Sequence, residues 1–106
     1  MTEPGALLGT LRYMAPEQLT GRAPAESWDL WAIAIVAFEM LAGVHPFGTS
    51  ADWRSVLIEN RFPPLNLDAP ALTQQLKEFF ERSLSVDRAQ RPASVRHFMV
   101  ELQAAL

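Results

Sequence analysis

The longest apolar run in the chain is LWAIAIVAF, residues 30–38, which lies between Asp29 and Glu39. This run falls inside a helix that we predict from Ser27 to Ala42, because the glycine at position 43 is suited to the residue just after a helix. It is too short to cross a bilayer, which takes roughly 20 apolar residues. Since no face of the run carries a polar residue, the pattern predicts a helix that is buried on nearly all sides.

Shorter helices are predicted on either side of this segment. Pro16 suits the first position of a helix and Gly21 suits the position after its end, so residues 16–20 are expected to form one helical turn. Ser50 is expected to cap a helix that runs through Asn60. Its apolar positions follow at helical spacing: Trp53, Val56 and Leu57.

Two amphipathic patterns occupy the C-terminal part. Asp68 is expected to cap the first, and Ser94 the second. The first apolar face consists of Leu72, Leu76, Phe79, Phe80 and Leu84, and the second of Val95, Phe98, Met99, Leu102 and Leu106. The prolines in residues 61–70 favour an extended segment, and residues 85–93 predict a tight connection. No segment alternates as a strand does, so the sequence predicts a single all-α unit.

Composition excludes several classes of protein. The 106 residues carry a net charge of −3 and no block of Lys or Arg, which argues against nucleic acid as a partner. Cysteine is absent, which excludes disulfides and thiolate metal sites and favours a cytoplasmic protein. The segment MTEPGALLGT lacks the basic and apolar regions of a signal peptide. No membrane association is therefore expected.

Motifs for common chemistry are also absent. The sequence contains neither GxGxxG nor GxxxxGK[ST], so it encodes no phosphate-binding loop of those kinds. His45 and His97 lack metal-ligand spacing, and we interpret them as a loop residue and a solvated helix residue. Solvated helix faces also account best for Asp52, Glu59, Glu78, Glu81 and Glu101. The three tryptophans, Trp28, Trp31 and Trp53, are more typical of core or interface anchors than of ligand sites.

Three motifs nevertheless share one resemblance. GTLRYMAPEQ, residues 9–18, resembles the end of the activation segment of eukaryotic-type Ser/Thr protein kinases, with Gly9, Thr10, Tyr13, Ala15, Pro16 and Glu17 at the matching positions. DLWAIAIVAFEMLAGVHPF is similar to the central F helix of that family and its following loop, with Asp29, Trp31, Glu39, Leu41, Gly43, Pro46 and Phe47 in register. SLSVDRAQRPAS is similar to the segment between the last two helices, with Leu84, Asp87, Arg91 and Pro92 matching.

The resemblance covers essentially the whole chain and implies the helical C-terminal part of a kinase large lobe. The family usually has glycine at Ala34 and proline at Arg88, and both departures are mild. The glycine loop, the ATP-anchoring lysine, and the catalytic and metal-binding aspartates lie upstream in the family and have no counterpart here. Residues 1–106 are therefore expected to be a partial kinase domain, without N-lobe or catalytic loop. ATP and Mg belong to the intact kinase, and the chain alone is expected to bind no cofactor or metal.

The resemblance also assigns roles to individual residues, none of them catalytic. Thr10 resembles the threonine whose hydroxyl reaches the catalytic aspartate. Together with Gly9, Leu11, Arg12 and Tyr13 it resembles the loop that receives the substrate residue after the phosphorylated one. We call residues 9–13 the peptide loop.

Structural roles are implied for three further residues. Glu17 is implied to pair with Arg91, whose planar fork suits a carboxylate, although an isolated glutamate is more often solvated. Asp29 is implied to accept backbone N–H groups of the catalytic loop. Without that loop, Asp29 is explained equally well as an acidic residue in the first turn of a helix.

We therefore hypothesise that the chain is a fragment of a Ser/Thr protein kinase. The resemblance implies that the intact parent phosphorylates protein Ser or Thr, and the fragment alone is expected to be inactive. The alternative is a docking or decoy module without catalysis. The expected partners are a protein substrate or the missing half of the kinase. Because the short helices cover only part of the central helix, we also expect apolar surface around Leu30, Ile33 and Ala34, so that the chain self-associates, binds a partner or stays loosely packed.

Overall fold

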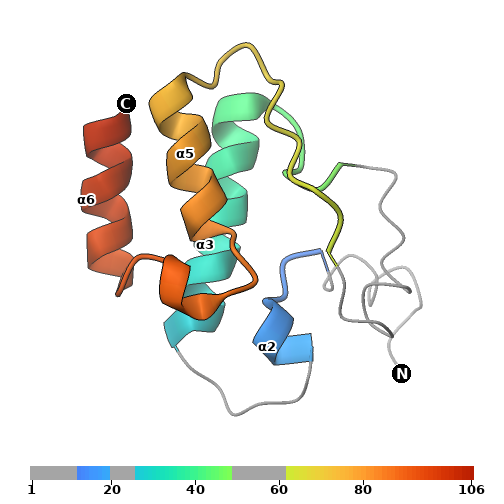
Figure 1. The fold of residues 1–106 in the computed structure, drawn as a ribbon, viewed down its shortest axis with the longest axis vertical. Coiled ribbons are helices and arrows are strands. Elements are labelled where there is room, and N and C mark those ends of the chain that lie inside the picture. Colours follow the sequence, from blue (N-terminus) through green and yellow to red (C-terminus); the bar gives the residue numbers. More distant parts are fainter. Residues whose placement is uncertain (1–11, 20–25, 49–61) are drawn as a thin grey trace.

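The computed structural model describes residues 12–19, 26–48 and 62–106. It contains the helices α2 (Pro16–Leu19), α3 (Glu26–Ala42), α5 (Gln74–Ser83) and α6 (Val95–Ala105), and the short 3₁₀ helix η1 (Arg88–Gln90). No strand occurs among the described residues, which confirms the all-α prediction. The helix predicted from Ser50 to Asn60 lies outside them. In Figure 1, α3, α5 and α6 lie side by side, and α2 lies beside the beginning of α3.

Helix α3 begins one residue earlier than predicted. Glu26 and Asp29 occupy its first turn, where the positive end of the helix dipole favours acidic side chains. The helix ends at Ala42, and the Gly43 N–H donates to the Glu39 carbonyl at 2.8 Å. Gly43 has a φ of +79°, a left-handed conformation in which only glycine avoids a steric penalty, so this residue ends the helix.

Helix α3 is the central helix of the described chain, as predicted, although part of its surface is exposed. Its buried residues are Leu30, Trp31, Ala34, Ile35 and Phe38. Exposed surface does occur on α3, but at Val36 and Met40 rather than at Leu30 and Ala34, and Met40 is 82% exposed. Helices α5 and α6 both pack against α3 and against each other, and the exposed apolar surface of α3 is a narrow stripe at Val36 and Met40.

Helix α5 begins later than the sequence predicts. Thr73, not Asp68, is its N-cap, and its hydroxyl accepts the Leu76 N–H at 3.2 Å. The Leu72 N–H donates to the Ala69 carbonyl in a turn, so the chain changes direction between Asp68 and the helix. All five predicted apolar positions, residues 72, 76, 79, 80 and 84, are buried, which confirms the predicted face.

Helix α6 is capped as predicted, since the Ser94 hydroxyl accepts the His97 N–H at 3.1 Å. A carboxylate oxygen of Glu26 accepts the Val95 N–H at 3.1 Å and so joins the beginnings of α3 and α6. The predicted apolar face is too wide, however. Phe98 is fully buried, but Met99 is 51% and Leu106 70% exposed, because α6 is the outermost of the three packed helices.

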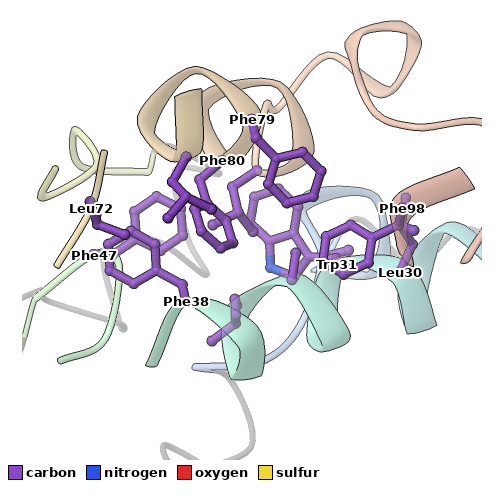
Figure 2. Close-up of a cluster of buried hydrophobic side chains, with 13 residues drawn as sticks. Leu30, Trp31, Phe38, Phe47, Leu72, Phe79, Phe80 and Phe98 are labelled. Carbon is purple, nitrogen blue, oxygen red and sulfur yellow. The ribbon is translucent and has the colours of Figure 1, made fainter. Parts of the chain in front are cut away.

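Aromatic side chains join these helices into one core (Figure 2). The Phe38 ring on α3 meets the Phe80 ring on α5, and the Phe79 ring on α5 meets the Phe98 ring on α6, both at 5.1 Å between centroids. Trp31 stacks on Phe47 of the loop after α3 at 5.9 Å. Among the described residues, no helix has both the length and the apolar character needed to span a membrane.

Candidate functional site

The segment that resembles the end of an activation segment is attached closely to this core. Ala15 and Pro16 are buried, and α2 forms a single helical turn after them. The Ala15 N–H donates to the Gln18 side chain at 3.2 Å, while the Gln18 N–H donates to the Ala15 carbonyl at 3.0 Å. These reciprocal bonds fix the direction in which residues 12–14 approach α2.

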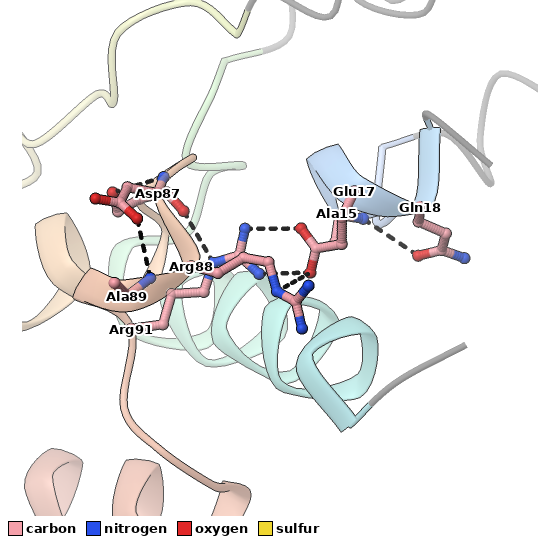
Figure 3. A network of polar contacts seen from close by, with 8 residues as sticks. Ala15, Glu17, Gln18, Asp87, Arg88, Ala89 and Arg91 are labelled. Atoms are coloured by element: carbon pink, nitrogen blue, oxygen red, sulfur yellow. Dashed lines mark hydrogen bonds and ion pairs between the residues drawn. The ribbon is translucent and has the colours of Figure 1, made fainter. Parts of the chain in front are cut away.

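Glu17 and Arg91 lie in direct contact, as the resemblance implies (Figure 3). The Arg91 Nη1 and Nη2 groups donate to the two carboxylate oxygens of Glu17 at 2.7 Å and 2.9 Å. Such a two-pronged arrangement combines charge with fixed geometry. Each residue is only 6% exposed, so water competes little for the pair. The contact joins α2 to the segment before α6, although the two residues are 74 positions apart.

Arg91 also places its Nε donor and the flat face of its guanidinium within the same core. Its Nε donates to the Ser85 carbonyl at 2.9 Å, and its guanidinium carbon lies 4.8 Å from the ring centre of Trp31. Arg88 adds a second, weaker positive charge at 3.8 Å from Glu17, with its own side chain about half exposed. Arg91 therefore connects α2, α3 and the loop after α5.

The charge state of Glu17 follows from these contacts. Burial raises the pKa of the Glu17 carboxyl, but the hydrogen bonds from Arg91 and the positive charge of Arg91 outweigh it and lower the pKa to about 2. Glu17 is therefore a carboxylate at neutral pH, and the pair remains charged over the whole physiological range.

Tyr13, the last residue of the peptide loop, is bound to α3. Its hydroxyl donates to a carboxylate oxygen of Glu39 at 2.8 Å. This hydrogen bond raises the pKa of the Tyr13 phenol, and burial and the negative charge of Glu39 add to the effect. The phenol therefore keeps its proton at neutral pH, and Tyr13 fixes the end of the peptide loop to the side of α3.

Arg12 is held by a residue to which the sequence analysis gave no role. The Nε2 atom of His45 lies 2.9 Å from the Arg12 carbonyl oxygen, and His45 is only 2% exposed. The ring of His45 also meets the Tyr13 ring edge-on at 5.9 Å. No sequence signal separated this histidine from a solvated loop residue, because its partner is a backbone carbonyl 33 positions earlier.

The other predicted site residues either lie outside the described residues or make no hydrogen bond within them. Gly9, Thr10 and Leu11 lie outside the described residues, so the structure describes only Arg12 and Tyr13 of the peptide loop. Asp29 is exposed in the first turn of α3 and makes no hydrogen bond within the described ranges. The same ranges contain no group of three or more His, Cys, Asp or Glu side chains that could hold a metal ion.

Comparison with known proteins gives a consistent result. The model of the protein kinase domain family matches residues 2–102. The chain is 32% identical to the serine/threonine-protein kinase PknD of Chlamydia pneumoniae over its whole length, but it covers only 12% of that protein. It is 33% identical to the serine/threonine-protein kinase Pkn1 of Myxococcus xanthus, with 99% of this chain and 15% of that protein covered. It thus spans about an eighth of the length of these curated relatives.

Solved structures show the same fold. The kinase PK-1 of Cydia pomonella granulovirus matches 84% of this chain and 34% of its own, with a TM-score of 0.67 and 23% identity. A twitchin kinase fragment of C. elegans matches 86% of this chain and 21% of its own, with a TM-score of 0.63 and 25% identity. The helical arrangement in Figure 1 is therefore one that recurs within larger kinase structures.

Proposed function

The chain belongs to the protein kinase family, and on that premise we propose that it is the substrate-holding helical part of the large lobe of a Ser/Thr kinase. The intact parent transfers the terminal phosphoryl group of ATP to a protein Ser or Thr hydroxyl. The chain alone, with none of the catalytic residues, is inactive. A cytoplasmic location is part of the proposal, and the cysteine-free sequence favours it.

The observation that carries this proposal is the double attachment of the peptide loop to α3 and its following loop. The Tyr13 hydroxyl is bound to Glu39 at 2.8 Å, and the Arg12 carbonyl is bound to His45 at 2.9 Å. One contact fixes a side chain and the other fixes the backbone of the preceding residue. A loop held in this way presents a surface of fixed geometry to a substrate peptide. Catalysis needs this fixed geometry because small displacements of the reacting groups strongly lower the rate.

The Glu17–Arg91 pair supports the same role from the other end of the segment. It holds α2 on the core, so that residues 12–14 extend from a fixed point. Glu17 and Arg91 thus act as positioning residues, and neither approaches the reacting atoms in this proposal. Asp29, exposed at the beginning of α3, remains available to accept N–H groups of a catalytic loop that this chain does not contain.

In this proposal the chain itself binds neither ATP nor Mg. The sequence has no glycine-rich phosphate loop, and the described ranges hold no cluster of metal-binding side chains. In the proposal both bind to parts of the intact kinase that correspond to no residue of this chain. There the ion neutralises phosphate charge during transfer. The residues of this chain only hold and orient the protein substrate.

A chimeric kinase tests the proposal. The matching segment of the Chlamydia pneumoniae kinase is replaced by residues 1–106, and incorporation of labelled phosphate into a generic Ser/Thr protein substrate is measured. We expect activity from the chimera and none from the chain alone. A control chimera carrying Arg91→Ala should lose activity together with its folded structure, whereas Arg96→Ala, on an exposed position of α6, should retain both. A folded but inactive parent chimera would contradict the proposal.

A second function is favoured by the uncovered side of α3. Val36, Met40 and Val44 are large apolar side chains that are 46%, 82% and 41% exposed. Exposed apolar surface of this kind is typical of interfaces, so the alternative is a docking or decoy module that binds the missing half of a kinase or a second copy of itself. Sedimentation of the chain and its Met40→Lys variant tests this. Association that Met40→Lys abolishes supports binding of a second copy, and two identical monomers contradict it.

A further inference from the structure

Both ring nitrogens of His45 make hydrogen bonds, one to the peptide loop and one within the loop that carries His45 itself. Its Nε2 lies 2.9 Å from the Arg12 carbonyl oxygen, and its Nδ1 lies 3.2 Å from the Phe47 backbone nitrogen. A backbone carbonyl can only accept a hydrogen bond, and a backbone N–H can only donate one. The contacts therefore assign the proton to Nε2 and leave Nδ1 as an acceptor, which is one tautomer of the neutral ring.

Protonation of His45 is incompatible with this arrangement. A proton on Nδ1 would face the Phe47 N–H, so two donors would point at each other and the Phe47 hydrogen bond would be lost. The added charge would also lie in a site that is 2% exposed. A positive charge is unfavourable at so buried a site, so the protonated ring is disfavoured there.

The charged and titratable groups around the ring act in both directions. Burial is the main cause that lowers the pKa of His45 from its ordinary value of 6.5, and the positive charge of Arg12 lowers it further. The hydrogen bond to the Arg12 carbonyl and the negative charge of Glu39 oppose this shift, but they are weaker in sum. The Tyr13 phenol faces the ring edge-on and keeps its proton, because the pKa of Tyr13 is raised.

We infer that His45 is a positioning residue that works as a pH-dependent latch: its neutral ring holds the Arg12 backbone at the end of the peptide loop, and protonation releases that backbone. The loss of the Phe47 hydrogen bond and the move of the ring break the contact with the Arg12 carbonyl, while the Tyr13–Glu39 bond remains as the second attachment. That the loop receives a substrate rests on the proposed function. The latch itself does not, since all of its parts lie within the described residues.

The direction of the pH effect follows from the lowered pKa. The unfolded or released form of His45 binds a proton at about its ordinary pKa of 6.5, whereas the latched form resists it. The latch is therefore at full strength above pH 6.5 and weakens as the pH falls below that value.

Nuclear magnetic resonance of the chain labelled with nitrogen-15 tests the inference directly, without nucleotide or peptide. We expect His45 to show the Nε2–H tautomer and a pKa below 6.5. The ring signals of Tyr13, the only tyrosine in the chain, should shift with pH and have the same midpoint as those of His45. Protection of the Phe47 amide against exchange should be lost over the same range. An Nδ1–H tautomer, or a His45 pKa at or above 6.5, would overturn the latch.

A matched pair of variants separates the latch from a general effect of acid. In His45→Gln the side chain retains a donor for the Arg12 carbonyl but cannot be protonated, so the Tyr13 signals should stop responding to pH between about 5 and 7. His97→Gln should leave the Tyr13 response unchanged. If the Tyr13 signals of folded His45→Gln still follow the midpoint seen in the unmodified chain, another group drives the change and the inference is wrong. If His45→Gln does not fold, the test rests on the unmodified chain. Equal midpoints of His45 and Tyr13 support the latch, and different midpoints contradict it.

Discussion

Two groups of polar contacts, one at each end, tie residues 12–17 to the helical core, and they differ in kind. Glu17 and Arg91 form a charged, doubly hydrogen-bonded pair that is almost wholly buried (Figure 3). Arg12 and Tyr13 are instead held by a neutral imidazole and by one hydrogen bond to Glu39. The first contact joins α2 to the segment before α6, and the second joins the peptide loop to α3 and the loop that follows it.

The difference separates a permanent attachment from an adjustable one. The Glu17 pKa of about 2 keeps the first pair charged at any physiological pH. The second attachment depends on a histidine, the side chain whose charge changes most readily near neutrality. The end of the segment that meets the core is therefore fixed, while the end that would meet a substrate responds to its surroundings.

The largest effect should come from breaking the charged pair. Arg91→Ala leaves the Glu17 carboxylate buried without its main partner, and we expect a loss of about 3–5 kcal/mol in the free energy of unfolding. A chain of marginal stability would then fail to unfold cooperatively. Urea unfolding followed by tryptophan fluorescence measures this, with Arg96→Ala on an exposed position as control. Small and equal effects of the two substitutions would show that the pair is not important for stability.

Acid should weaken the same contact at a much lower pH than the histidine contact. Because the pKa of Glu17 falls from 4.5 to about 2 on folding, its contribution is complete above pH 4.5 and is lost as the pH falls towards 2. The shift corresponds to about 3 kcal/mol. We expect the stability difference between the unmodified chain and Glu17→Gln to shrink over this range in denaturant titrations. A difference that stays constant down to pH 2 would contradict the assigned ionisation.

Removing the Tyr13 hydroxyl should have a smaller effect. Tyr13→Phe loses one partly buried hydrogen bond to Glu39, whose carboxylate can turn to water, so we expect a cost of about 1 kcal/mol. Amide exchange should speed up at residues 12 and 13 without change in α5 or α6. Faster amide exchange throughout the core would instead show that the Tyr13 hydroxyl, like the Glu17–Arg91 pair, stabilises the whole fold.

The smallest effect is expected at Asp29, which lies on the same helix but outside both contacts. Asp29→Asn removes a favourable charge from the first turn of α3, which is worth about 0.5 kcal/mol. Thermal unfolding at low and high salt checks this, since screening should abolish the difference. A loss of stability comparable to that of Arg91→Ala would indicate that Asp29 has a partner that the structure does not show.

The sequence predicted the helical class and much of the core, because apolar spacing depends on local geometry alone. All five predicted positions of α5 are buried, and Ser94 caps α6 as expected. The prediction of Asp68 as a cap was wrong because a turn at Pro70 comes between it and the helix. Met99 and Leu106 were assigned to the buried face, but only packing against a further neighbour could have covered them.

The contacts of the site were predictable from the sequence only where the matching motifs contained both contacting residues. The contact of Glu17 with Arg91 followed from matching segments 74 positions apart, and no local pattern indicates it. His45 had no such signal, since its partners are the backbone groups of Arg12 and Phe47. A contact between a side chain and a distant backbone group leaves no trace in residue identity, so it appears only in the folded structure.

Calorimetric titration of ATP with Mg²⁺ into the purified chain measures whether these residues bind nucleotide. We propose that they hold a protein substrate and that the nucleotide binds to other parts of an intact kinase. We therefore expect no saturable heat of binding from the chain, while the chimeric kinase gives a saturable signal under the same conditions. Tight, saturable binding of ATP by the chain itself would contradict this division of roles.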